Sequence, residues 1–215
     1  MKHNEALERL QEIQRIAERT TLYTQLPGLA AIIGGLLAWI GCALSFFLMH
    51  SFDFGTLVQL SPSHQLFFVL MWTGIGLIAV IQEVIFTTHD AKKQGIEPLS
   101  RPGKLSAYSL TPSVLVALVI SLKLFLDAGT SEAAIQNVRY LAPLWMMCYG
   151  TGIYAAGLFS IRLPRMLGLA FIITGAAGLI YFENYGLLLV ALSFGLLHII
   201  FGIIVITKAK RRQQA

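Results

Sequence analysis

Long stretches without a charged residue dominate this sequence and limit what the chain can fold into. Residues 20–52 and 54–82 lack Asp, Glu, Lys and Arg entirely, and four later gaps of 18, 22, 17 and 24 residues follow. About 20 apolar residues are needed for a helix to cross the hydrocarbon core of a bilayer. A backbone in lipid must also satisfy its own hydrogen bonds. These gaps therefore predict an all-α, polytopic membrane protein rather than a water-soluble domain.

The gaps predict six transmembrane helices in one domain that covers residues 27–207. Residues 1–26 form a cytoplasmic lead and residues 208–215 a basic cytoplasmic tail. The segment 89–106 contains two prolines and two glycines and is expected to be irregular. The six expected spans are 27–49, 66–88, 107–127, 138–160, 164–182 and 186–207.

Basic residues cluster on one side of these expected spans and predict the orientation of the chain. Fourteen of the 16 Lys and Arg residues lie in the lead, the loop after span 2, the turn after span 4 and the tail. Only Lys123 and Arg139 fall on the other side. Since cytoplasmic segments carry the excess of Lys and Arg, both termini are expected in the cytoplasm. The basic segments then need no nucleic-acid partner to explain them.

The lead contains an amphipathic pattern over residues 4–19, with the sequence NEALERLQEIQRIAER. Apolar side chains recur on one face and charged side chains on the other, as in a helix. Four acidic and four basic residues in the lead cancel, whereas lipid-surface helices are usually rich in Lys and Arg. The helix is expected to pack on its own bundle, or to bind a second copy or another protein. The apolar candidates for that contact are Leu7, Leu10, Ile13 and Ala17.

Small residues predict close helix packing in the first and last spans. Ala30, Gly34 and Ala38 recur at four-residue spacing, and Gly195 and Gly202 flank His198 in the last span. Such spacing lets two helix backbones approach closely in a membrane. Contacts within the bundle, a homodimer seam and contact with another membrane protein all fit this pattern.

Glu83 and His198 are the ionisable residues deepest in the expected spans. Ionisable groups inside a membrane are costly and are often functional. The two form an expected intramembrane polar site, with a proton- or cation-linked pair and a structural hydrogen bond as the alternatives. His50, Asp53 and His64 around the first outer loop are weak candidates for a zinc site. No catalytic residue and no cofactor is expected.

Three segments resemble a family of uncharacterised bacterial inner-membrane proteins with six spans. They are ALERLQEIQRIAERTTLYTQLPGLAAIIGG, HDAKKQGIEPLS and YGLLLVALSFGLLHIIFGIIVITKAKR. The resemblance implies a bacterial inner-membrane location and a signalling or stress context. It assigns Tyr185, Gly186, Gly195, His198 and Gly202 to a recurring C-terminal pattern of that family.

These patterns together predict a protein that acts by binding, in an accessory or sensory role, with the cytoplasmic helix as its interaction surface. A small proton- or cation-linked transporter or channel that uses Glu83 and His198 is the alternative. The protein is expected to contact the lipid bilayer. Its expected partner is a second copy of the chain, in a homodimer, or another membrane or cytoplasmic protein that binds the N-terminal helix.

Overall fold

A computed structural model describes residues 9–10, 28–93, 101–128, 132–159 and 162–214. Within these ranges the chain is helical, with short 3₁₀ turns and no β-strand. The α-helices are α2 (Gly28–Met49), α3 (Pro62–Lys93), α4 (Arg101–Ala128), α5 (Glu132–Asn137), α6 (Leu141–Ala156), α7 (Arg162–Tyr181), α8 (Gly186–Val190) and α9 (His198–Gln214). A π-helical segment, Ala191–Leu197, joins α8 to α9.

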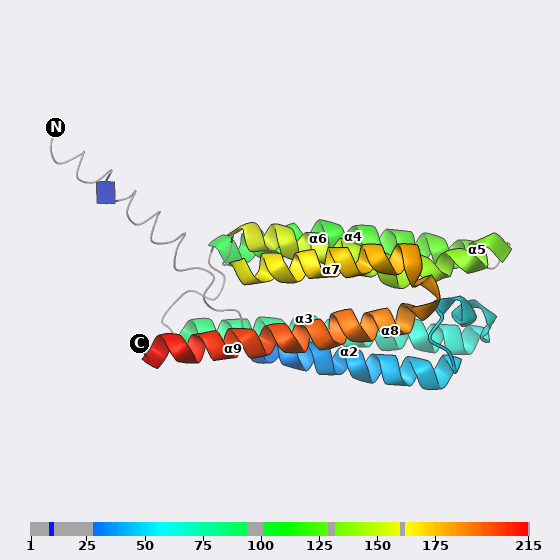
Figure 1. Cartoon of the computed structure of the whole chain (residues 1–215), viewed down its shortest axis with the longest axis horizontal. Helices are drawn as coiled ribbons and strands as arrows, with labels where there is room; N and C mark the ends of the chain where they lie inside the picture. Colours follow the sequence, from blue (N-terminus) through cyan, green and yellow to red (C-terminus); the bar gives the residue numbers. More distant parts are fainter. Residues whose placement is uncertain (1–8, 11–27, 94–100, 129–131, 160–161, 215) are drawn as a thin grey trace.

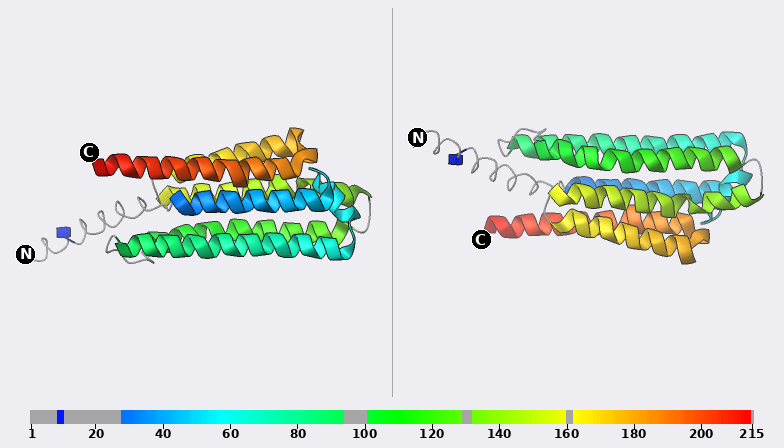
Figure 2. Two further views of the ribbon diagram at one scale, coloured as in Figure 1. Left: turned by 90° about the horizontal axis from the view of Figure 1, so that it is seen from below. Right: turned by 90° about the horizontal axis from the view of Figure 1, so that it is seen from above.

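The long helices form two layers of three (Figures 1 and 2). The first layer contains α3, α2 and the α8–α9 helix, with α2 in the middle. The second layer contains α4, α6 and α7, with α6 in the middle. Helix α2 lies opposite α6, α3 opposite α4, and α9 opposite α7. The N-terminus of α2 and the C-terminus of α9 lie at the same end of the molecule, which we call the basic end because Lys92, Lys93 and Lys208 lie there.

Among the described residues, five helical segments are long and apolar enough to cross a membrane, so the chain is a multi-pass membrane protein in contact with lipid. They are Gly28–Met49, Pro62–Lys93, Lys104–Asp127, Arg162–Tyr181 and Glu183–Arg211. Helix α6 has 16 residues, and 3₁₀ turns Val138–Tyr140 and Gly157–Phe159 flank it. Five of the six expected spans therefore correspond to helices of sufficient length.

The prediction of an irregular segment over 89–106 is wrong at both ends. Helix α3 continues to Lys93 and α4 begins at Arg101, so that only 94–100 lie outside the described residues. Pro102 falls in the first turn of α4, where a missing backbone N–H costs no intrahelical hydrogen bond. The gaps between charged residues therefore underestimate the lengths of these two helices, because a helix can continue after it leaves the hydrocarbon.

The expected amphipathic helix falls almost wholly outside the described residues. Leu7, Ile13 and Ala17 are not described. Arg9 and Leu10 are helical, and the Leu10 side chain is 60% exposed. The amphipathic helix and its contact surface therefore stay predictions.

Candidate binding site between the two helical layers

A hydrogen bond between Tyr149 and His198 joins the two layers inside the membrane. Tyr149 belongs to α6 in the second layer, and His198 begins α9 in the first. The Tyr149 hydroxyl lies 2.9 Å from His198 Nε2, and which group donates depends on the tautomer of the imidazole. A tyrosine or a histidine in an apolar interior needs such a partner for its polar end. The charge and spacing patterns did not single out Tyr149, although a tyrosine in the middle of an expected span is itself a signal.

Phenylalanine side chains surround this hydrogen bond. The Phe171 ring centroid lies 5.1 Å from that of Tyr149 and 5.2 Å from that of His198. Phe194 is 5.0 Å from Tyr149 and stacks on His198 at 6.1 Å. Phe171 is fully buried, and Met146 and Leu167 complete the same core cluster. The pair thus lies in an aromatic surrounding that strengthens its electrostatic interactions.

The π-helical segment determines where His198 points. A π turn adds about one residue to the helix, which rotates the following residues by roughly 100° relative to an uninterrupted α-helix. Gly195 and Gly202 contact α2, whereas His198 contacts α6. His198 Nδ1 makes no hydrogen bond within the described residues. Such π turns are frequent at functional sites.

Glu83 lies at the same depth as His198 but is not its hydrogen-bond partner. Each residue is ten positions from a lysine at the basic end, Lys93 and Lys208, which is about 15 Å along a helix. Helix α2 separates α3 from α9 in the first layer. His198 instead bonds Tyr149, and Glu83 lies at the same depth on another helix, so the expected Glu83–His198 site stays a prediction.

Glu83 belongs to a sparsely covered edge of the molecule. Only 6% of the most apolar stretch of α3, and of α4, is buried, against 33% in α2 and in α7. The Glu83 side chain is exposed, and the described residues provide it with no hydrogen bond or ion pair. Gly76 lies two turns before Glu83 on the same face of α3. A Cβ added at Gly76 would meet no other heavy atom within 4 Å. Next to Glu83, Gln82 donates to the Ala30 carbonyl at 2.9 Å while its Oε1 is buried without a partner.

The predicted packing glycines of the last span lie directly against α2. A Cβ on Gly35 would be 2.6 Å from the Gly195 carbonyl oxygen, and a Cβ on Gly28 would be 2.6 Å from that of Gly202. These distances leave no room for a side chain, so the two backbones touch at both levels.

The other small residues of α2 lie on several of its faces. Ala30 and Ala38 are buried. Gly34 faces α3 instead, with Gln82 Nε2 3.8 Å from its Cβ position. The Cys42 thiol is 3.7 Å from the Leu187 carbonyl oxygen, and both Cys42 and Cys148 are free.

The three weak metal candidates have other partners or lie apart. Asp53 forms an ion pair with Arg139, 2.9 Å from its NH2 nitrogen, and also accepts a hydrogen bond from the Gly55 backbone at 2.7 Å. His64 Nδ1 bonds the Ser61 hydroxyl at 2.8 Å, and His50 is exposed at the end of α2. The described residues contain no group of three or more His, Cys, Asp and Glu side chains that could hold a metal ion.

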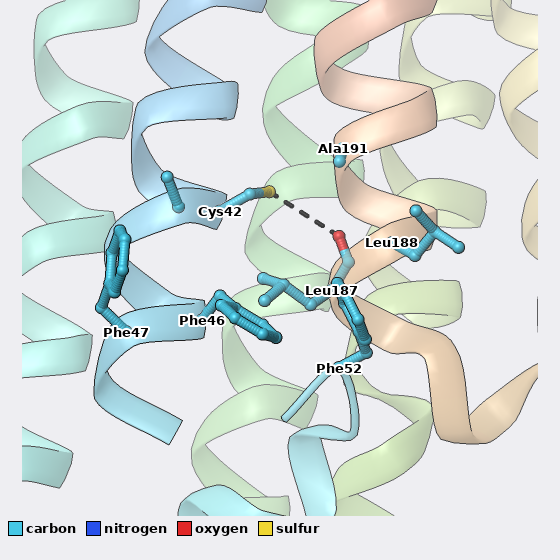
Figure 3. A pocket seen from close by; sticks show the side chains of 8 residues that line it. Cys42, Phe46, Phe47, Phe52, Leu187, Leu188 and Ala191 are labelled. Atoms are coloured by element: carbon cyan, nitrogen blue, oxygen red, sulfur yellow. Dashed lines mark hydrogen bonds between the residues drawn. The ribbon is translucent and has the colours of Figure 1, made fainter. Parts of the chain in front are cut away.

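An apolar groove of about 310 Å³ lies at the other end of the first layer, between α2 and α8 (Figure 3). Phe46 and Phe47 of α2 form one side of it, and Leu187 and Leu188 of α8 form the other. Phe52, from the loop after α2, lies across the groove near Phe46. The groove carries no charged side chain and lies far from Glu83 along the helices.

Comparison of the chain with protein-family models, with curated proteins and with solved structures finds no match. The fold and the residues between the layers are therefore the basis for assigning a function.

Proposed function

We propose that this chain is a non-catalytic inner-membrane protein that acts by binding a ligand between its two helical layers. The observation that carries the proposal is the Tyr149–His198 hydrogen bond, with Glu83 at the same depth. The three groups come from both layers, so a ligand beside them alters how the layers contact each other. A change of that kind reaches the basic end through continuous helices, as an accessory or sensory role requires.

The topology is part of the proposal. Helix α6 and its two flanking 3₁₀ turns form 22 consecutive residues, 138–159, and extend about 36 Å at the rises of these helix types. Together with the five long helices they make six crossings. The positive-inside rule then places the basic end and both termini in the cytoplasm. Cysteines introduced at Lys2 and Gln213 should resist an impermeant reagent added outside intact cells, and labelling of either would contradict this topology.

The sequence resemblance supports a bacterial inner membrane and membership of the six-span family. The amphipathic pattern of residues 4–19 supports a second interaction surface on the N-terminal lead, where Leu7, Leu10, Ile13 and Ala17 are expected to contact the bundle, a second copy or another protein.

The binding function is tested by native mass spectrometry of the protein purified from its own membrane. We expect a bound small molecule on the wild type that is lost from the double variant Glu83→Gln/His198→Phe. The thermal melting temperature of the double variant in the same detergent reports whether it is folded. Identical spectra from the wild type and a folded double variant would refute a ligand between the layers.

A small proton- or cation-linked transporter or channel is the second candidate, and the Tyr149–His198 bond with Glu83 at the same depth favours it. Ionisable groups on different helices can relay a proton inside a membrane. In proteoliposomes with a trapped pH indicator, the wild type should then move protons when a substrate gradient is applied, and Tyr149→Phe should slow this movement. Equal rates for both proteins would leave binding alone as the function.

A further inference from the structure

The chemistry around Glu83 indicates which ligand this site takes, an inference that rests on the proposed function. A carboxylate inside the hydrocarbon region is costly unless it is paired. The described residues give Glu83 no ion pair or hydrogen bond, and its side chain is exposed on the edge of α3. A cationic group that arrives from the bilayer supplies the missing partner.

The apolar surroundings select among cations. An inorganic divalent cation takes about six or more oxygen ligands, and no metal-binding group of acidic and His or Cys side chains occurs within the described part of the chain. An organic cation with apolar arms is weakly hydrated, so one carboxylate beside an apolar surface can hold it. Glu83 provides the carboxylate, and the exposed apolar face of α3 provides the surface.

The surface next to Glu83 has room for the apolar part of such a ligand. A Cβ at Gly76, on the same face of α3 as Glu83, would meet no heavy atom within 4 Å, whereas one at Gly35, Gly150 or Gly168 would be within 2.8 Å of another helix. Helix α3 is therefore open where α2, α6 and α7 are closed. A symmetric second copy fits this surface poorly. It would bring a second Glu83 carboxylate to the same depth and supply no positive charge to pair with either one.

We propose that Glu83 and the adjacent open surface of α3 bind a lipophilic organic cation, an ammonium or phosphonium centre with apolar arms, that enters laterally from the bilayer. The carboxylate recognises the charge, and Gly76 leaves space for an arm of the ligand.

The experiment measures binding of tetraphenylphosphonium to the full chain in lipid nanodiscs by isothermal titration calorimetry. Tetraphenylborate, which has the same shape and the opposite charge, is the control ligand. We expect the wild type to bind the phosphonium at least tenfold more tightly than the borate. Glu83→Gln should lose at least tenfold in phosphonium affinity, and Glu83→Asp should keep most of it. The matched control, Glu183→Gln at the far end of the molecule, should bind like the wild type.

A second variant keeps the test decisive if Glu83→Gln does not fold. Gly76→Leu retains the carboxylate and adds a Cβ that meets no heavy atom within 4 Å, so it should fold, but its side chain occupies the open space and should weaken phosphonium binding. The proposal is overturned if the wild type binds both ions equally or neither ion. It is also overturned if folded Glu83→Gln and Gly76→Leu both bind like the wild type. A small molecule seen by native mass spectrometry that disappears in the double variant would leave the proposed function intact in either case.

Discussion

Replacement of Gly35 by alanine should push α2 and the last helix apart and destabilise the protein. The new methyl group would lie 2.6 Å from the Gly195 carbonyl oxygen and 2.7 Å from Ile199 Cγ1. The isoleucine can change rotamer, but the carbonyl belongs to a helix backbone and cannot rotate away. Overpacking of this kind costs about 1–3 kcal/mol, and the rigid neighbour favours the upper half of that range.

The helix propensity of alanine acts in the opposite direction and must be separated from packing. Gly→Ala in a helix interior stabilises by roughly 0.5–1 kcal/mol. Gly76→Ala gains this contribution without a clash, because no heavy atom lies within 4 Å of its Cβ position. The difference in unfolding free energy between the two variants therefore isolates the packing cost, which should be about 2–3 kcal/mol.

The assay is reversible unfolding in mixed micelles with increasing sodium dodecyl sulfate, followed by circular dichroism. Gly35→Ala should unfold at a lower detergent fraction than the wild type, and Gly76→Ala at a higher one. Equal stability of the two variants would refute the close approach of the two backbones at Gly35 and Gly195.

Three further predictions use the same unfolding assay. His50→Gly should stabilise by about 1 kcal/mol, because His50 has a φ of 50°, a conformation that glycine adopts without strain; a loss of stability would contradict this. Arg139→Ala should cost roughly 1–3 kcal/mol because Asp53 loses its ion pair, and Arg139→Lys should recover only part, since the guanidinium uses two nitrogens; full recovery would argue against the two-nitrogen contact. Trp39→Phe should cost about 1 kcal/mol by removing the 2.9 Å hydrogen bond to the Ala191 carbonyl, and an unchanged midpoint would exclude a stabilising role for it.

The positions of the long helices could be predicted from the sequence because a charge in hydrocarbon is costly, which makes charge-free gaps informative. The length of α3 could not, because its last turns carry Asp90, Lys92 and Lys93 and lie outside any such gap. The short length of α6 could not be predicted either. The charge-free gap that contains α6 also includes residues of the 3₁₀ turns on both sides of it.

The polar site was only partly predictable for a different reason. The depths of Glu83 and His198 follow from counting residues along each helix. Their partners depend on which helices face each other, and neither periodicity nor charge contains that information. The Tyr149–His198 bond joins residues 49 apart, and the Asp53–Arg139 bond joins residues 86 apart. The π turn that aims His198 leaves no signal in the apolar segment ALSFGLL.

The two layers differ in how their helices are held together, and this difference bears on how a ligand could act. Within each layer, glycines bring backbones into contact, as Gly35 does with Gly195 and Gly150 with Gly168. Such contacts have one close-packed arrangement and resist sliding. Between the layers, side chains make the contact, through aromatic rings and the Tyr149–His198 bond. Side chains can change rotamer and exchange partners at smaller cost than backbones can move apart. A ligand beside the Tyr149–His198 bond would therefore act on the interface that yields more readily, and the helix pairs in backbone contact are expected to move together.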